Sequence, residues 1–546
     1  MPGRGDILIV ENDPLVLEGN QLLFELEGYR VFTAVSVAEA VAILDHNHID
    51  LAVIDVRLSN DHDTYDRSGI ELAEQMPPEV AKVLITAFHK FEYRSSLPQN
   101  LWHLAKQAGP AALVDKVARI FRDTIRLNRQ LDIDLAPKIT TESLVQQMKP
   151  FRDLEGEALT ETSDELSKLF CRLFLREKRI YLSPLKPGYG GAGVALVRPF
   201  YPTKGAYVVV KFGLREQIAP EVENYREYVE PYIQLNATEM VGDMAQTRRL
   251  AGVRYRFIGA QPRGQTQDFA SVYFDETRTH DSIKDILVDL FEDSCGLWYD
   301  GKQEWSEGLC PKTAVDCYKE QLGLCEPEDW QQLKEAQEKM LQPDGLFARH
   351  SATELKVAWP PNRVQILPDP VCFVETYADK LPLPARYCIT HGDLNGNNVF
   401  VDEDSHTWLI DFSRTGWGPA LRDVTELETV IKYEFLAEDD VFKRLAFEDI
   451  ALAPDWFRRP LILPDELSKQ FAYVRAHAAI QQIRYSAAQI AETDAMTAYW
   501  VGLLFYALKF VSWDETTRRG ALLSLPIRQQ ALYGAARLCQ RLAAFL

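Results

Sequence analysis

The sequence predicts a multidomain protein with an α/β fold at its N-terminus and an α+β fold in the remainder. Three observations lead to this prediction. The chain has 546 residues, which is too long for one compact core and favours two to four domains. Apolar strand-like runs alternate with helix-like stretches over the first 130 residues, as in a doubly wound parallel sheet. Most of the second half has helix-like patterns, interrupted by one polar hairpin.

The composition excludes several classes of protein. Hydrophobic residues make up 46% of the chain and charged residues 26%, as in ordinary globular proteins, and the formal charge is −20. This charge argues against binding to a nucleic-acid backbone, which needs clustered Lys and Arg. The eight cysteines form no CxxC pair, which disfavours a zinc site and fits a reducing cytoplasm.

No segment is expected to cross a membrane. The N-terminal stretch "MPGRGDILIV" turns directly into a strand pattern and has no signal-peptide core. The most apolar late stretch, at 498–511, contains Lys509 and is shorter than the roughly 20 residues that a span requires. We therefore expect a buried helix there and a cytoplasmic protein.

Three strand-like runs predict the N-terminal α/β domain: "DILIV" at 6–10, "LAVIDV" at 51–56 and "VAKVLITA" at 80–87. In the helix-like stretch at 36–47, apolar residues recur at helical spacing. Functional groups of parallel sheets gather where strands end. The stretch "AALV" at 111–114 is expected to be a further strand. The polar residues that follow or close these strands are Glu11, Asn12, Asp13, Asp55, Thr86 and Lys116.

Such a cluster would hold a divalent ion beside a phosphorylated carboxylate, and residues 1–128 resemble the receiver domain of bacterial response regulators. By role, the resemblance implies the phosphoacceptor Asp55, the switch residues Thr86 and Lys116, and Mg²⁺ ligands from Glu11 together with Asn12 or Asp13. It also implies a cognate histidine kinase as partner and leaves a homodimer open. The alternative is a receiver-like domain that packs and dimerises without being phosphorylated.

Residues 129–174 are charged, helical in period and poor in Gly and Pro, which predicts an ordered helical connector. A glycine-rich segment between two strand-like runs follows, and its backbone amides could cover phosphates. Its glycines are Gly188, Gly190, Gly191 and Gly193. Lys211 lies on the next strand, and Glu221 on a helix whose apolar stripe would turn it inward. Together they would form an ion pair that orients a nucleotide.

The polar hairpin reads "ITHGDLNGNNVFVDE" and continues to "HTWLIDFSRTG". A strand, a turn at 403–405 and a second strand would bring Asp411 back beside Asn398, so that both offer hard oxygen ligands to Mg²⁺. Asp393 would then be free to accept a hydroxyl proton. Phosphoryl transfer requires these parts: metal-clamped phosphates, a positioned lysine and a carboxylate near the acceptor.

Residues 175–546 resemble the protein-kinase-like superfamily, in the branch of aminoglycoside phosphotransferases and choline kinase. The resemblance implies two lobes, at 175–275 and 276–546, the second mostly helical, with ATP and Mg²⁺ as cofactors. By role it implies the catalytic base Asp393, the metal ligands Asn398 and Asp411, and the nucleotide-binding residues Lys211, Glu221 and the four glycines. Asp423 and either Glu426 or Glu428 would support the site.

Two hypotheses follow for the whole chain. The first is a two-component-type signalling protein in which the receiver regulates an ATP-dependent phosphotransferase. The second is a pseudokinase adaptor that binds nucleotide or a protein partner without transferring phosphate. The sequence leaves the phosphoryl acceptor open, and it disfavours a DNA-binding response regulator because it has no helix-turn-helix pattern.

Overall fold

The computed structural model divides into two units, Met1–Ala219 with Val241–Arg254, and Pro220–Met240 with Tyr255–Leu546. Each unit is described separately. The structure describes residues 5–47, 49–59, 65–77, 80–86, 100–128, 130–185, 191–201, 203–232, 238–257, 266–307, 309, 312–359, 363–381, 386–493, 495–513 and 523–546.

The N-terminal part of the first unit is built on a five-stranded parallel sheet with the order β2-β1-β3-β4-β5. Its strands are β1 (Asp6–Val10), β2 (Arg30–Ala34), β3 (Leu51–Asp55), β4 (Ala81–Thr86) and β5 (Leu101–Ala105). Every residue of β1, β3 and β4 is buried, which explains their continuous apolar runs. The expected parallel α/β domain is confirmed.

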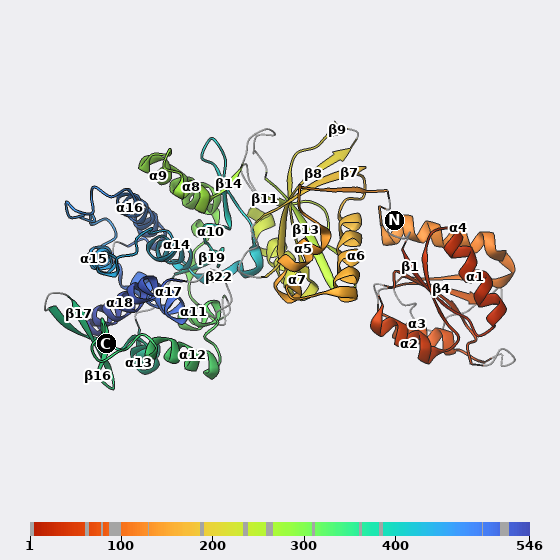
Figure 1. Ribbon diagram of the computed structural model, residues 1–546, viewed down its shortest axis with the longest axis horizontal. Coiled ribbons are helices and arrows are strands. Elements are labelled where there is room, and N and C mark those ends of the chain that lie inside the picture. Colours follow the sequence, from red (N-terminus) through yellow and green to blue (C-terminus); the bar gives the residue numbers. More distant parts are fainter. Residues whose placement is uncertain are drawn as a thin grey trace. The chain divides into compact units, whose positions relative to one another are not determined.

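Helices cover both faces of this sheet (Figure 1). On one face, α1 (Pro14–Leu26) and α4 (Gly109–Ile120) pack against a core that contains Ile7, Ile9 and Val53. On the other face, α2 (Val37–His46) and α3 (Ser68–Gln75) pack against a core that contains Leu8 and Ile54. Alternate residues of each strand thus serve opposite cores, as the two-residue period of a strand requires.

The predicted fifth strand at 111–114 is wrong. These residues belong to α4, and the strand that completes the sheet is β5, ten residues earlier. The run of small and apolar residues in "AALV" fits either a buried strand or a helix face, so periodicity could not distinguish them.

The rest of the first unit is a mostly antiparallel sheet with three associated helices. Its path is β13-β10-β8-β7-β6, with β12 beside β13 and β9 beside β8. The strands are β6 (Asp132–Leu135), β7 (Arg179–Pro184), β8 (Gly193–Tyr201), β9 (Thr203–Lys204), β10 (Val208–Leu214), β12 (Ala245–Gln246) and β13 (Leu250–Phe257). The helices are α5 (Thr141–Gln147), α6 (Gly156–Leu173) and α7 (Arg215–Asn224), which continues into the second unit.

The predicted connector is ordered and largely helical, but it is no separate bridge. Its strand β6 pairs with β7, and its helices α5 and α6 share one apolar core with β7, β8 and β10. Leu144, Leu166 and Leu169 are fully buried in that core. The connector is therefore part of the fold of this second sheet.

Two ion pairs join α6 to the N-terminal sheet within the first unit. Lys168 pairs with Asp6 at the start of β1, and Arg172 pairs with Asp50 immediately before β3. Both carboxylates are buried, with at most 3% of their residue surface exposed. These contacts lie at the amino ends of the strands, opposite the edge at which Asp55 ends β3.

The second unit is rich in helices: α8 (Phe269–Phe274), α9 (His280–Val288), α10 (Gly296–Asp300), α11 (Ala314–Leu322), α12 (Pro327–Glu338), α13 (Pro370–Tyr377), α14 (Arg422–Tyr433), α15 (Val441–Leu452), α16 (Phe471–Ala491), α17 (Thr497–Ser512) and α18 (Leu525–Leu542). Three small sheets have the orders β14-β20-β21, β15-β19-β22 and β16-β17-β18. Their strands are β14 (Gln267–Asp268), β15 (Gln303–Glu304), β16 (Phe347–Ser351), β17 (Glu354–Trp359), β18 (Arg363–Pro368), β19 (Arg386–Thr390), β20 (Val399–Val401), β21 (Thr407–Leu409) and β22 (Gly416–Pro419). In addition, β11 (Thr238–Met240) pairs with residues 255–257 of β13.

Helix α14 is the centre of this unit. All of its residues are buried, and it packs against α16 and α17 (Figure 1). The apolar stretch at 498–511 falls within α17 and is buried, as expected. Among the described residues, no helix combines the length and the apolar character that crossing a bilayer requires.

Candidate functional site

The receiver site gathers at the carboxyl edge of the parallel sheet. Asp55 closes β3 and Glu11 follows β1, and both are buried. Lys106 Nζ lies 2.6 Å from Asp55 Oδ2 and 3.4 Å from Glu11 Oε2. Burial, and then the charge of Asp55, raise the pKa of Glu11. Two carboxylates and one ammonium group thus share the site, as phosphate chemistry on Asp55 would need.

Lys106 occupies the position that the sequence analysis assigned to Lys116. Lys106 directly follows β5, whereas Lys116 lies in the middle of α4. Burial would lower the pKa of Lys106, but its hydrogen bond to Asp55 and the charge of Asp55 raise it overall. The placement of Lys116 was wrong because it depended on the mistaken strand at 111–114, and the lysine counter-ion follows the true last strand.

The other predicted receiver residues have distinct surroundings. Thr86 ends β4, is buried and pairs in register with Ala105, the residue before Lys106. Asn12 Oδ1 is buried and has no hydrogen-bond partner among the described residues. Asp13 instead caps α1, since its carboxylate accepts hydrogen bonds from the amides of Leu15 and Val16. An orphaned oxygen beside two carboxylates fits a hard cation, with Glu11, Asn12 and Asp55 as the candidate ligands.

The polar hairpin of the second unit forms as predicted. Strands β20 and β21 are antiparallel, with Val399 opposite Leu409, and the amide of Ile410 donates to the carbonyl of Asn398 at 3.0 Å. This pairing returns the chain to the loop, so that Asp411 follows directly. The Asn398 side-chain nitrogen donates to the Asp393 carbonyl at 2.8 Å and to its carboxylate at 3.2 Å. Both hydrogen bonds use the Asn398 side-chain nitrogen, so the side-chain oxygen of Asn398 is the atom that could bind a metal.

Asp411 has a left-handed backbone conformation, with φ 69° and ψ 69°. Residues other than Gly rarely adopt it, and such strain is concentrated at functional sites. The Ser413 hydroxyl donates to Asp411 Oδ1 at 2.7 Å, and Asp411 is 7% exposed. Asp411 and Asn398 are each held by hydrogen bonds within this segment, and a carboxylate together with an asparagine oxygen is a donor set that suits Mg²⁺.

Buried carboxylates of α14 hold the loop that carries Asp393. Asp423 accepts the amides of His391 and Gly392 at 2.8 and 2.9 Å, and Glu426 accepts the amide of Leu394 at 3.0 Å. Both acids are almost completely buried. These charge-assisted bonds hold three backbone amides of the loop within four residues. The supporting role predicted for Asp423 therefore agrees with its contacts.

Of the two alternatives left open, Glu426 and not Glu428 supports the loop. Glu428 points to α16, where Arg484 donates to it at 2.7 and 2.9 Å. Burial raises the pKa of Glu426 to about 7, against the lowering effect of Lys509. Despite burial, Arg484 lowers the pKa of Glu428. The pKa values of two glutamates on one helix thus shift in opposite directions, because only Glu428 accepts hydrogen bonds from a guanidinium group.

Gly392 cannot be replaced in this loop. Its φ is +79°, and a Cβ there would lie 1.9 Å from Arg422 Nη2 and 2.3 Å from the Arg414 carbonyl oxygen. Glycine alone permits both this conformation and this close approach. The loop is consequently seated directly on the guanidinium group of Arg422.

The remaining predicted residues are divided between the units. Glu221 is fully buried in α7 as predicted and accepts a hydrogen bond from the Tyr255 hydroxyl at 2.6 Å. Three residues later, Asn224 donates to the carbonyls of Phe412 and Ser413, which ties α7 to the Asp411 segment. Lys211 lies in β10 of the first unit and is 7% exposed, so its ion pair with Glu221 stays a prediction.

Two glycines of the predicted nucleotide loop, Gly188 and Gly190, lie outside the described residues. Gly191 has φ +82°, and Gly193 begins β8 opposite Phe212. A Cβ on Gly193 would lie 2.3 Å from the Phe212 ring, so this glycine is required by packing. Nothing in the described part of the loop tests nucleotide binding.

In the comparisons with known proteins, two family models match two different parts of the chain. The family model described as Response regulator receiver domain matches residues 7–117. The model described as Ternary complex associated domain 9 matches residues 178–354 and 325–509, which together cover more than half of the chain. The chain belongs to the Ternary complex associated domain 9 family. This protein with a Ternary complex associated domain 9 also carries a receiver domain, and it therefore belongs to two-component-type signalling.

Several solved structures of receiver domains are similar to part of this Ternary complex associated domain 9 protein. A CheY-like receiver domain from Methanospirillum hungatei JF-1 is 24% identical, with 22% of this chain and 94% of that chain covered and a TM-score of 0.18. The response regulator TrrA from Thermotoga maritima, in complex with Mg²⁺ and BeF, is 24% identical, with 21% and 98% covered and a TM-score of 0.18. TrrA was also solved with the histidine kinase ThkA, with 24% identity, 21% and 97% covered and a TM-score of 0.18. No curated protein matches this chain.

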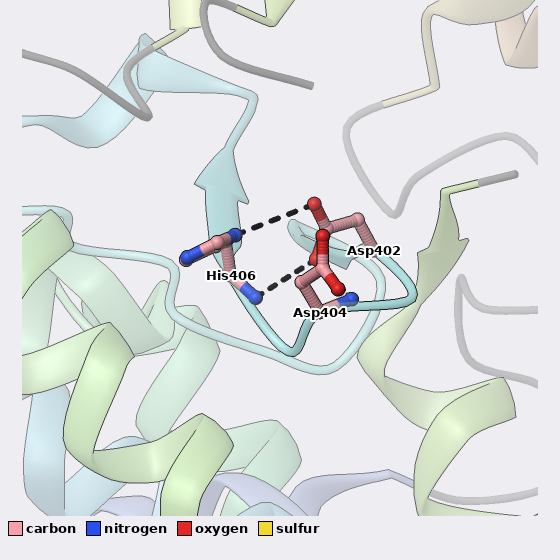
Figure 2. Close-up of side chains that lie close together, drawn as sticks. All are labelled: Asp402, Asp404 and His406. Carbon is pink, nitrogen blue, oxygen red and sulfur yellow. Dashed lines mark hydrogen bonds and ion pairs between the residues drawn. The ribbon is translucent and has the colours of Figure 1, made fainter. Parts of the chain in front are cut away.

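A cluster of Asp402, Asp404 and His406 lies in the turn of the β20–β21 hairpin (Figure 2). Asp402 Oδ1 accepts the backbone amides of Asp404 and His406, each at 2.9 Å, and its second oxygen lies 3.5 Å from His406 Nδ1. These bonds shape the tight turn. The cluster therefore has a structural explanation, and we assign no ion to it.

The sequence analysis missed two residues of these sites, Lys106 and Arg422. A signal for Lys106 was present, because "LWHLA" at 101–105 directly before it has strand-like alternation. Arg422 gave no such signal, since an arginine at the start of a helix is usually exposed.

Proposed function

We propose that this protein is a signalling phosphotransferase, in which a receiver phosphorylated on Asp55 controls transfer of a phosphoryl group from ATP to an acceptor hydroxyl. A histidine kinase would supply the phosphoryl group to Asp55, as the receiver family model suggests. The observation that carries the transferase part is the loop of Asp393 and Asn398, which buried carboxylates brace and to which the hairpin returns the chain directly before Asp411.

Each residue has a chemical role in this proposal. Asn398 and Asp411 hold Mg²⁺, and the bound metal neutralises charge on the ATP phosphates. Asp393 accepts the proton of the acceptor hydroxyl while the new oxygen–phosphorus bond forms. The bond between the γ-phosphorus and its bridging oxygen breaks, and ADP leaves with that electron pair. Lys211 and Glu221 orient the phosphates.

The bracing by α14 supports this assignment. A carboxylate near the acceptor must be held in place, because misplacement by about 1 Å can cost 100-fold in rate. Two buried acids that accept hydrogen bonds from loop amides supply such rigidity. Burying a carboxylate lowers the free energy of unfolding, and an ordinary turn does not require it.

The test is calorimetric titration of MgATP into the full chain and into Asp411→Asn. The variant should lose metal-dependent binding by at least about tenfold, the effect of one charged ligand. Asp393→Ala should still bind MgATP but transfer no phosphate. No binding to the wild type, with or without beryllofluoride on Asp55, would overturn the proposal and favour the pseudokinase adaptor.

A further inference from the structure

A cavity of about 530 Å³ opens beside the loop that carries Asp393, entirely within the second unit. Its lining includes Gly392 of that loop and the segment 413–417 after Asp411. The volume lies in the range of small-molecule sites. The cavity therefore borders both parts of the proposed transfer site, on residues that the proposed roles leave unused.

The lining is cationic although the whole chain is acidic. Lys312, Arg414 and Arg422 line the cavity against one carboxylate, Glu320, whereas the chain has a formal charge of −20. Glu320 pairs with Lys312, so the two arginines determine the charge that a ligand meets. A local positive field in an acidic protein attracts anions selectively to that place.

Arg422 is the decisive residue. It is 7% exposed, and it forms no ion pair within the part of the chain that the structure describes. Among the described residues, the Arg422 side chain makes one hydrogen bond, from Nη2 to the Arg414 carbonyl at 3.0 Å. Its buried Nε has no hydrogen-bond partner among these residues. The buried Arg484, by comparison, makes two bonds to Glu428. The charge of Asp423 acts on this guanidinium group, but no carboxylate in the described part of the chain is bonded to it, and an anion would complete its unpartnered Nε.

The other walls are aromatic and apolar. Tyr228 and Trp417 line the cavity together with Leu309 and Cys317. Such surfaces accept an aromatic ring or an aliphatic group of a ligand. The exposed Arg414 lines the same cavity. The ligand that fits has one anionic group and one apolar part.

We propose that this cavity binds the phosphoryl acceptor, and that the acceptor is a small hydroxyl compound with a carboxylate or phosphate group held by Arg422 and Arg414. The acceptor role rests on the proposed function, whereas anion binding does not. The anionic group anchors the molecule, and the hydroxyl faces Asp393. Its oxygen then bonds to the γ-phosphorus, its proton passes to Asp393, and ADP leaves.

The experiment compares probes that share a phenol ring and differ in charge. They are 4-hydroxyphenylacetate, 4-hydroxyphenyl phosphate, the neutral 4-hydroxyphenylacetamide and the cationic tyramine. Saturation-transfer NMR on the full chain without nucleotide gives their dissociation constants. We expect both anions to bind at least about tenfold more tightly than the amide, the effect of one charge-assisted hydrogen bond. The better of the two anions distinguishes carboxylate from phosphate.

The variants locate the binding. Arg414→Gln should weaken the anions about tenfold and leave the amide unchanged. Arg459→Gln, an exposed arginine outside the cavity, should change nothing. Because Arg422 also supports Gly392, Arg422→Lys, which keeps the charge, is used as the second variant, and it should weaken the anions more than the amide.

Three results would overturn the inference: equal binding of all four probes, no binding of either anion at millimolar concentration, or anion binding that Arg414→Gln leaves intact. The two proposals fail separately. Anion binding without any ATP turnover would support the anion site and refute the proposed phosphotransferase activity. Phosphoryl transfer to uncharged acceptors, with no preference for anions, would refute the anion site and leave the transferase standing.

Discussion

At the residue scale, Lys106 and Glu426 show how surroundings set the charge of a side chain. Lys106 lies between two carboxylates, Asp55 and Glu11, which raise its pKa despite burial. Glu426 is fully enclosed, and burial raises its pKa to about 7. Each residue yields a prediction whose control is a residue of the same type.

Lys106→Met should remove the response of the receiver to beryllofluoride with Mg²⁺, a mimic of phosphorylated Asp55. Without the ammonium group, nothing compensates the added negative charge, and the mimic should bind at least about tenfold more weakly. The measurement is the rise in thermal unfolding temperature as the mimic is added. Lys116→Met, in α4, should respond like the wild type, and an unchanged response in Lys106→Met would refute the counter-ion role.

Glu426 should make stability depend on pH between about 4.5 and about 7. Within this window the unfolded chain has lost the proton and the folded protein keeps it, so the free energy of unfolding falls as pH rises. The total fall is about 3 kcal/mol. Urea unfolding across this window should show that Glu426→Gln removes the fall. Glu428→Gln should retain it, because the pKa of Glu428 is lowered and this group stays charged throughout.

At the element scale, α14 combines two functions on one buried helix. Asp423 and Glu426 face the loop that carries Asp393, while Glu428 faces α16 and pairs with Arg484. The helix therefore couples the geometry of the loop to the packing of the helical core. Breaking the Glu428–Arg484 pair should lower the free energy of unfolding. Replacing Asp423 should change the geometry of the loop that carries Asp393.

Arg484→Met should destabilise α14 by about 4 kcal/mol, because it leaves the buried Glu428 carboxylate uncompensated. Native-state hydrogen exchange of the α14 amides measures this loss. The double variant Arg484→Met/Glu428→Met should regain much of it, since no buried charge is then unpaired. Additive losses in the double variant would contradict this account of the pair.

At the scale of the whole chain, the receiver sheet is attached to the next part of the first unit by buried charges. Asp6 and Asp50 lie at the amino ends of the strands, and their partners Lys168 and Arg172 lie on α6. The edge that carries Asp55 is at the opposite ends of the same strands. A change at Asp55 would therefore have to pass through the rigid sheet to reach α6, which agrees with control by a shift between two states.

Lys168→Met combined with Arg172→Met should loosen the receiver from α6. Each lost partner leaves a buried carboxylate, at a cost of about 3 kcal/mol or more. Faster hydrogen exchange in α6 and at the starts of β1 and β3 would report the effect. Arg119→Met breaks the exposed pair with Asp115 and should cost less than about 1 kcal/mol. Equal effects of the two changes would refute the attachment.

The sequence by itself determined the elements whose signals are local. The buried strands β1, β3 and β4, the hairpin that returns Asp411 to Asn398, the inward Glu221 and the buried helix at 498–511 all follow from spacing and apolar pattern. Asp55 could be found because a carboxylate that closes a buried strand lies at a functional edge.

Only the tertiary structure decided which residues meet across long separations. It placed Lys106 and not Lys116 at Asp55, chose Glu426 over Glu428 for the loop, and buried Arg422 beside a cavity with its Nε unpartnered among the described residues. Each of these outcomes depends on strand order or on the direction in which a buried helix faces. Those properties arise from the packing of distant segments, and the period of a local pattern carries no information about them.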